Sequence, residues 1–162
     1  MAPAAPSRRS SASPVPRAGG FTLVELLTVV VILVVLAMLA GPAFTEFTAQ
    51  QRVQVTATDL FTSLLRARSE AIKQNTDVTL APVGTWNGGW VVAVGGANID
   101  THAATANIAI NGNLGIVTYR NSGRVSGATV PKFTLSASQT SLKRCVAVTL
   151  SGEPVVTNAA CS

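Results

Sequence analysis

One carboxylate stands inside an apolar stretch, where a charge is costly. From Phe21 to Ala40 the only polar side chains are Thr22, Glu25 and Thr28. A charge at the centre of a bilayer costs on the order of 3 kcal/mol and usually marks a functional position. Glu25 is about one helical turn into the run, so we expect it near the interface, where the cost is lower. It still needs a cationic partner, and the nearest upstream cations are Arg17, Arg9 and Arg8.

The other reactive residue types form no catalytic arrangement. The single histidine, His102, lies in a polar stretch that we predict to be a loop, and the acids are scattered, whereas a hydrolase triad needs a base and an orienting acid together. Gly95-Gly96 lacks the Lys-Ser/Thr that follows a phosphate-binding glycine loop. Two cysteines and one histidine do not supply four zinc ligands. The sequence therefore predicts no enzyme, no metal and no cofactor.

The element that must carry Glu25 is a helix of membrane length. The apolar run reaches the roughly 20 residues that span a bilayer. Arginines precede it and none follows closely, which places its start on the cytoplasmic side. A secretory signal peptide is the alternative, but cleavage after Ala40 would put Met38 at the third-last position, and cleavage after Ala43 would put Pro42 beside the cut. Neither site is good, so we favour a chain that stays anchored.

Gly20 followed by Phe-Thr-Leu-Val-Glu at Phe21–Glu25 resembles the processing site of class III prepilins. In that family a membrane peptidase cuts after the glycine and methylates the new N-terminal amine. The resemblance implies a discarded leader of residues 1–20, N-methylation of Phe21, and pairing of Glu25 with the N-terminal ammonium of a neighbouring subunit. Such pairing is chemically reasonable, because opposite charges attract strongly at low dielectric and each is costly alone.

Length and charge fit one small domain behind this helix. The chain has 162 residues, and removing the leader and the apolar run leaves about one small domain and a stalk. Formal net charge is +5, of which the leader's three arginines supply +3, so the mature chain keeps +2. The basic balance is therefore weak support for a nucleic-acid partner.

An amphipathic pattern continues the helix beyond the apolar run. We predict one helix from about Phe21 to Lys73, with an apolar part over 21–43 and an amphipathic part over 44–75. We also predict a bend near Pro42, because proline removes a helix hydrogen bond, and a proline often lies at this distance from the cut in pilins. Two helices broken at Gly41-Pro42 are the alternative. The predicted core face contains Val53, Ala57, Leu60, Leu64, Ala67 and Ala71, widened by Phe61, Leu65 and Ile72.

Short strand-like runs follow the predicted helix stop at Asn75. The predicted strands cover 77–81, 90–94, 106–110, 115–120, 132–136, 144–150 and 154–157. Turn residues separate them at 84, 87–89, 95–98, 111–113 and 121–123. Short strands separated by turn residues indicate an antiparallel sheet. This sheet would pack on the apolar helix face as an α+β domain over 76–162.

Three further segments resemble the GspH/FimT group of minor pilins and pseudopilins. Residues 67–75 followed by 78–80 are similar to that group's passage from helix to first strand, and 86–92 to its tryptophan hairpin. Residues 144–148, Ser151-Gly152 and Cys161 resemble the disulfide-closed tails of the type IV pilus members. The resemblance implies a pilin-like fold, with a long N-terminal helix packed on an antiparallel sheet. The loop from Gly95 to Thr105 departs from the pattern, so no metal site is transferred to it.

The same resemblance implies a disulfide between Cys145 and Cys161. Export to the periplasm would permit this bond. By the chain-entropy model, closing so short a loop would contribute about 3 kcal/mol. Two free thiols in a cytosolic protein are the alternative.

A basic C-terminal region leaves DNA binding open. Arg120 and Arg124 flank a predicted turn from which side chains reach a phosphate backbone, and Lys143 and Arg144 are further candidates. Some members of the resembled family bind DNA through a Gly-Arg-x-Arg tail motif. This chain has Gly-Glu-Pro-Val at 152–155 instead, and a glutamate repels phosphate. A solvated basic face is the alternative.

The sequence therefore predicts a minor pilin that is inserted in the bacterial inner membrane, with its C-terminal domain periplasmic, and assembled at or near the tip of a type IV pilus. The expected partners are other minor and major pilins, the inner-membrane assembly platform and the prepilin peptidase. A pseudopilin of a type II secretion system is the first alternative, and a DNA-binding pilin for DNA uptake is the second.

Overall fold

The computed structural model describes residues 20–162, which contain one long helix followed by strands. One compact unit ends at Leu39, and the second runs from Ala40 to Ser162. Helix α1, Leu23–Lys73, includes residues of both units, and the two-helix alternative stays open. The bend predicted near Pro42 stays a prediction. Apart from Gly20, the predicted leader lies outside the described residues.

The helix ends where the sequence predicts, through a left-handed cap at Asn75. Asn75 has φ of 50°, which asparagine tolerates better than most residues. The amide of Thr76 donates to the carbonyl of Ala71 at 3.2 Å, and the amide of Asn75 donates to the carbonyl of Ile72 at 3.3 Å. This pair of bonds is the Schellman motif, which satisfies the last helix carbonyls and turns the chain toward the first strand.

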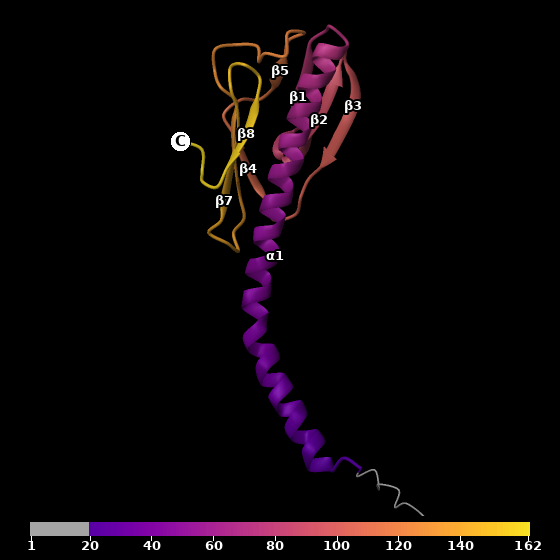
Figure 1. Cartoon of the computed structure of the whole chain (residues 1–162), viewed down its shortest axis with the longest axis vertical. Coiled ribbons are helices and arrows are strands. Elements are labelled where there is room, and N and C mark those ends of the chain that lie inside the picture. The colour runs from indigo at the N-terminus through magenta and orange to yellow at the C-terminus, as the bar shows by residue number, and fades with distance from the viewer. Residues whose placement is uncertain (1–19) are drawn as a thin grey trace, which may run out of the picture. The chain divides into compact units, whose positions relative to one another are not determined.

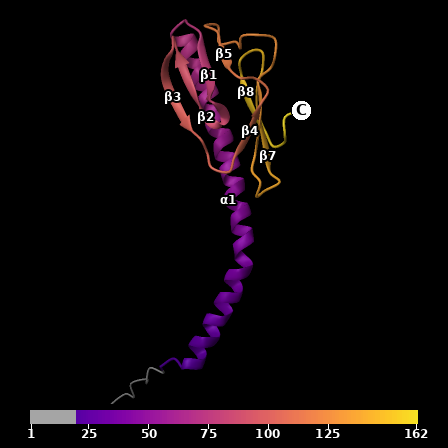
Figure 2. The ribbon, with the colours of Figure 1, turned by 180° about the vertical axis from the view of Figure 1, so that it is seen from behind.

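The strands of the described residues form two four-stranded antiparallel sheets. Sheet A has the order β3-β2-β1-β5 and sheet B the order β4-β6-β7-β8. In Figures 1 and 2, β3 and the strands around β7 lie on opposite sides of the C-terminal half of α1. The α+β class is confirmed, with two sheets in place of one. The bounds are β1 Val78–Val83, β2 Thr85–Val94, β3 Ala97–Ala103, β4 Ala109–Gly112, β5 Val117–Tyr119, β6 Lys132–Ser136, β7 Lys143–Val148 and β8 Pro154–Thr157.

The core lies between the second half of α1 and both sheets. Six helix residues predicted to face it are buried: Val53, Ala57, Leu60, Leu64, Ala67 and Ala71. Phe61 is partly buried against them, but Leu65 and Ile72, which were also predicted to face the core, are 41% and 52% exposed. Each follows a buried residue and lies about 100° further around the helix, beyond the arc that the sheets cover. Their prediction as core residues was therefore wrong.

Three segments predicted as turn or loop contain strand residues instead. Asn111 and Gly112, in the predicted turn at 111–113, belong to β4 and pair with β6. β3 occupies most of the predicted loop between Gly95 and Thr105, and none of its residues is buried, so it has no apolar alternation to reveal it. The predicted turn at 87–89 lies inside β2, and the β1–β2 turn is at Gly84 alone. Gly89 has φ of 93°, and a Cβ there would collide with the carbonyl oxygen of His102. Glycine at position 89 of β2 therefore allows the backbone of β3 to lie close to it.

Candidate functional site

The chain around the predicted cut lies outside the helix. Gly20, Phe21 and Thr22 are exposed and not helical, and α1 begins at the next residue. Thr22 Oγ1 accepts a hydrogen bond from the amide of Glu25 at 3.2 Å, and its carbonyl accepts one from the amide of Leu26 at 3.2 Å. Thr22 is thus the N-cap residue, with a glutamate three residues later as in a capping box. The predicted scissile bond therefore lies in exposed chain ahead of the helix.

The side chain of Glu25 has no partner within residues 20–162. Its amide is bound by Thr22 and its carbonyl by the Thr28 hydroxyl at 2.9 Å, whereas no hydrogen bond or ion pair there engages its carboxylate. The apolar side chains around it are exposed too, from Phe21 at 83% to Met38 at 73%. An unpaired acid on a bare apolar helix is available to a cation from another chain.

By length and composition, no single helix within residues 20–162 qualifies as a membrane span. The segments Leu23–Met38 and Ala43–Lys73 qualify only when they are taken together. The predicted membrane-spanning part over 21–43 therefore stays a prediction.

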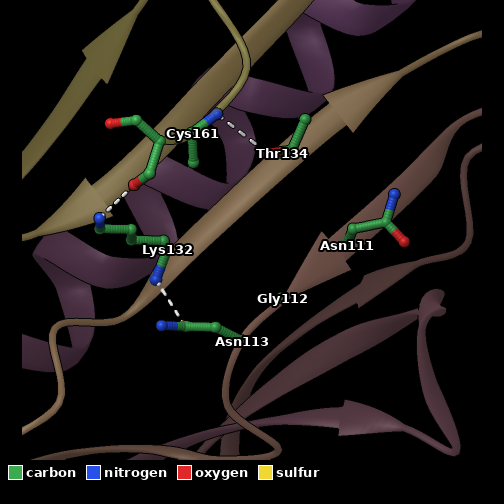
Figure 3. A pocket seen from close by; sticks show the side chains of 7 residues that line it. Asn111, Gly112, Asn113, Lys132, Thr134 and Cys161 are labelled. Atoms are coloured by element: carbon green, nitrogen blue, oxygen red, sulfur yellow. Dashed lines mark hydrogen bonds between the residues drawn. The ribbon is translucent and has the colours of Figure 1, made fainter.

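The C-terminal tail is fastened to sheet B. Cys145 and Cys161 form a disulfide with an S–S distance of 2.01 Å, which confirms the predicted pairing. The amide of Cys161 donates to Thr134 Oγ1 at 3.0 Å, and Lys132 Nζ donates to the main-chain oxygen of Ser162 (Figure 3). These residues line a polar hollow of about 470 Å³. Its lysine and threonine are already engaged by the tail, so the arrangement holds the chain end in place.

The four cations proposed for DNA contact fall into two groups. Lys143 and Arg144 are the first residues of β7. Arg120 and Arg124 lie beyond its other end, where Gly152 contacts the loop that carries them. Six strand residues span about 20 Å, so the two groups are separate. The arginine pair lines its own hollow of about 430 Å³.

His102 was predicted to lie in a loop, but it joins β3 to the helix. Its Nε2 lies 3.0 Å from the carboxylate of Asp59 in α1, and its ring stacks on Trp90 with centroids 4.1 Å apart. Trp90 Nε1 in turn donates to Ser63 Oγ of α1 at 2.9 Å. Because Trp90 and Ser63 are buried, this indole bond satisfies two polar groups inside the core.

An ion pair also ties the same strand to the same helix. Arg66 Nη1 lies 3.2 Å from the carboxylate of Asp100, and Arg66 Nη2 donates to the carbonyl of Ile99 at 3.2 Å. We call the pairs Asp59–His102 and Arg66–Asp100 the β3 latch. β3 has no fully buried residue, and it is held by this latch, by its ladder with β2 and by Ile99, which is partly buried against the core.

Two groups in the domain have shifted pKa values, and neither belongs to a reactive cluster. Burial raises the pKa of Tyr119, which the Arg68 guanidinium only partly offsets. The hydrogen bond from Gln74 lowers the pKa of Glu70, and Lys73 lowers it further. Among the described residues, no group of three His, Cys, Asp or Glu side chains could hold a metal ion.

Comparison with known protein families shows which family the chain belongs to. Residues 56–152 match the family described as type II transport protein GspH, and residues 16–41 match the prokaryotic N-terminal methylation motif. The chain belongs to the GspH family. The GspH match covers more than half of the chain, and the methylation motif spans Gly20, Phe21 and Glu25. This GspH-family protein is therefore a minor pilin or pseudopilin, as predicted.

Solved structures show the same fold. The type IV minor pilin FimU of Pseudomonas aeruginosa matches in two crystal forms, with TM-scores of 0.61 and 0.58 and identities of 21% and 20%. These matches cover 68% and 64% of this chain and 92% and 91% of FimU. The minor pseudopilin EpsH of Vibrio cholerae matches with a TM-score of 0.54 and 12% identity, over 66% of this chain and 97% of EpsH. A search of curated proteins found no significant match.

Proposed function

We propose that this GspH-family protein is a minor pilin of a type IV pilus, with a structural and not a catalytic role. It is cleaved between Gly20 and Phe21, methylated at Phe21, and assembled at or near the filament tip, where it helps to start the filament. Before assembly it is anchored in the inner membrane with its domain in the periplasm. Its partners are other minor and major pilins, the prepilin peptidase and the assembly platform.

The observation that supports this proposal best is the unpaired carboxylate of Glu25. It stands three residues after an exposed, capped helix start, on a helix whose apolar side chains are bare. Cleavage before Phe21 creates one new cation, the terminal ammonium, at the same level of the helix. When such an ammonium from a neighbour meets the carboxylate of Glu25, each charge neutralises the other where water is scarce. Pairing therefore selects one register between helices.

The main alternative is a pseudopilin of a type II secretion system, which uses the same helix chemistry. The disulfide-closed tail supports the pilus, because the sequence there resembles type IV pilus members. DNA binding has no comparable support, since its candidate cations lie in two groups at opposite ends of β7.

Replacing Glu25 by glutamine tests the proposal. The amide keeps the size of the side chain but carries no charge to meet the ammonium, so we expect normal cleavage and loss of the protein from sheared filaments. Cleavage is read by mass spectrometry and incorporation by immunoblot. The matched control is Glu46→Gln, because Glu46 is an exposed carboxylate of the same helix that accepts a hydrogen bond from the Gln50 side chain at 3.2 Å. Incorporation of Glu25→Gln at the control's level would overturn the pairing role.

A further inference from the structure

Two turns pack against each other near the C-terminal end of α1. The first, residues 120–124, follows β5, and the second, residues 149–152, joins β7 to β8. Gly123 and Gly152 have φ of 74° and 86°, and a Cβ on Gly152 would collide with the carbonyl oxygen of Gly123. Each turn is also closed by a hydrogen bond between its own main-chain groups, at 2.7 Å in the first and 2.8 Å in the second. The glycine contact therefore holds the two turns in one arrangement.

The helix anchors both turns. Asn121 Nδ2 donates to Oδ1 of Asn75, at the helix end, at 3.1 Å. Arg68 Nη2 donates to the carbonyl of Ser151 at 3.4 Å, and a Cβ on Gly123 would lie 3.4 Å from Arg68 Nε. In Figure 1, β5 and the end of α1 lie at the same end of the domain. The guanidinium of Arg68 thus lies against both turns.

Both turns contribute to the hollow that Arg120 and Arg124 line, which we call the arginine hollow. The two arginines are exposed, and apolar walls come from Val125, Ala128 and Leu150. Leu150 is 46% exposed. A guanidinium offers its N–H donors in a planar fork that matches a carboxylate. Cationic donors beside apolar walls suit a protein segment that carries an acidic side chain next to an apolar one.

The positive charge at the arginine hollow is not neutralised within the domain. Arg68, Arg120 and Arg124 form no ion pair with an acid of residues 20–162, and Glu153, which follows the second turn, pairs with none of them. Arg120 Nε has a contact of 3.4 Å to Ser126 Oγ, and Arg68 Nε is buried without a hydrogen-bond partner in the same part of the chain. An anion at this end of the domain would therefore offset an excess of positive charge.

We propose that the arginine hollow binds an acidic segment of another protein. In this contact, an Asp or Glu carboxylate of the partner accepts hydrogen bonds from the Arg120 and Arg124 guanidinium groups, and a neighbouring apolar side chain packs on Leu150 and Ala128. The turns are already fixed by their glycine contact and by the helix, so little order is lost when the partner binds. This inference goes beyond the proposed function and does not require a filament.

The arginine hollow suits a carboxylate better than a nucleic acid. Affinity for a nucleic acid grows with the number of phosphates that a protein neutralises along the backbone. The other candidate cations, Lys143 and Arg144, lie at the far end of β7, about 20 Å away, so they do not extend the hollow into a continuous basic track. One acidic side chain needs only the two arginines that the hollow supplies.

Peptide binding to the full-length chain tests this proposal. The probe is Glu-Leu-Glu-Leu-Glu with both ends blocked, and its matched control is Gln-Leu-Gln-Leu-Gln, which has the same size and no charge. The chain is labelled with nitrogen-15 in a neutral detergent, and its arginine Nε–H signals are followed by NMR. We expect the acidic peptide to shift the signals of Arg120 and Arg124 until they saturate, and the control peptide not to shift them. An equal response to both peptides, or no response to either, would overturn the proposal.

Variants of the hollow give an independent readout. Arg124→Gln should weaken peptide binding by about fivefold or more, because a charge-assisted hydrogen bond is lost. Lys143→Gln, at the far end of β7, should bind as the wild type does. Replacing both Arg120 and Arg124 by glutamate should abolish binding of the acidic peptide and create binding of Lys-Leu-Lys-Leu-Lys. Since both arginines are exposed, these changes should not alter the unfolding of the domain. Unchanged binding in the double variant would refute the assignment.

Two further ligands separate the carboxylate partner from other anions. Inorganic phosphate should shift the signals of Arg120 and Arg124 less than the acidic peptide does at the same concentration, because it makes no contact with the apolar walls. Oligothymidine should bind more weakly than the peptide. An equal effect of phosphate would make the hollow a site for small anions, and tighter, Lys143-dependent binding of oligothymidine would make it part of a nucleic-acid surface. Either result would contradict the proposal and leave the role of Glu25 untouched.

Discussion

A single residue, Tyr119, makes the stability of the domain depend on pH in the alkaline range. It is the chain's only tyrosine, its side chain is fully buried, and its hydroxyl has no hydrogen-bond partner among residues 20–162. Burial raises the pKa of Tyr119, so its phenol stays neutral in the folded state, whereas it ionises near pH 10 in the unfolded chain. The folded state then holds a proton that the unfolded state loses, and the free energy of unfolding falls as pH rises above about 10.

We therefore expect the domain to lose up to about 1.4 kcal/mol of stability per pH unit above about pH 10, with no loss from this group at lower pH. Urea unfolding of residues 45–162, which keep every buried core residue, measures this loss. Tyr119→Phe is the control. It should match the wild type within about 0.5 kcal/mol at neutral pH, because no hydrogen bond is removed, and should lack the alkaline loss. An unchanged alkaline slope in Tyr119→Phe would assign the effect to other groups.

Which residues could be predicted from the sequence depended on how local their partners are. Glu25 was identifiable because its apolar surroundings and Gly20 are adjacent in the sequence. Other contacts join residues far apart in the sequence: 27 positions for the Trp90–Ser63 bond and 43 for the His102–Asp59 pair. No local sequence pattern predicts such contacts. Histidine and aspartate pair here because the fold brings β3 to the helix, which only the structure shows.

Among the elements, the tail behind β7 depends on its disulfide. The bond joins positions 16 residues apart, so replacing both Cys145 and Cys161 by alanine should lower the free energy of unfolding by about 3 kcal/mol. Urea unfolding with and without reductant measures this difference. The wild type should lose a similar amount on reduction, and the double variant should not respond to reductant. A loss below about 1 kcal/mol in both tests would mean that Lys132 and Thr134 hold the tail without the bond.

The elements that could be predicted are those whose own sequence has a strong pattern of apolar and polar residues. β6 and β8 have the bounds that their sequences predict, and the helix starts and ends within two residues of its predicted limits. β3 was missed because it is held by the polar β3 latch, by its ladder with β2 and by Ile99, and one apolar contact does not produce alternation in the sequence. Leu65 and Ile72 were misplaced for the opposite reason: they are apolar, but they lie beyond the arc of the helix that the sheets cover.

At the scale of the molecule, the α+β class could be predicted, but the division into two sheets could not. Alternation and turn residues indicate antiparallel strands, yet the order β3-β2-β1-β5 beside β4-β6-β7-β8 depends on long-range pairing. Membership of a filament explains the exposed apolar residues at the start of the helix.

Pairing of the Glu25 carboxylate requires a terminal ammonium that exists only after the leader is removed. The most direct test is the mass and N-terminal sequence of this protein isolated from assembled filaments. We predict a chain that begins at Phe21 and carries one added methyl group on its terminal nitrogen. A filament-bound chain that still carried residues 1–20, or that began at Gly41 or Phe44 after removal of a signal peptide, would contradict the account.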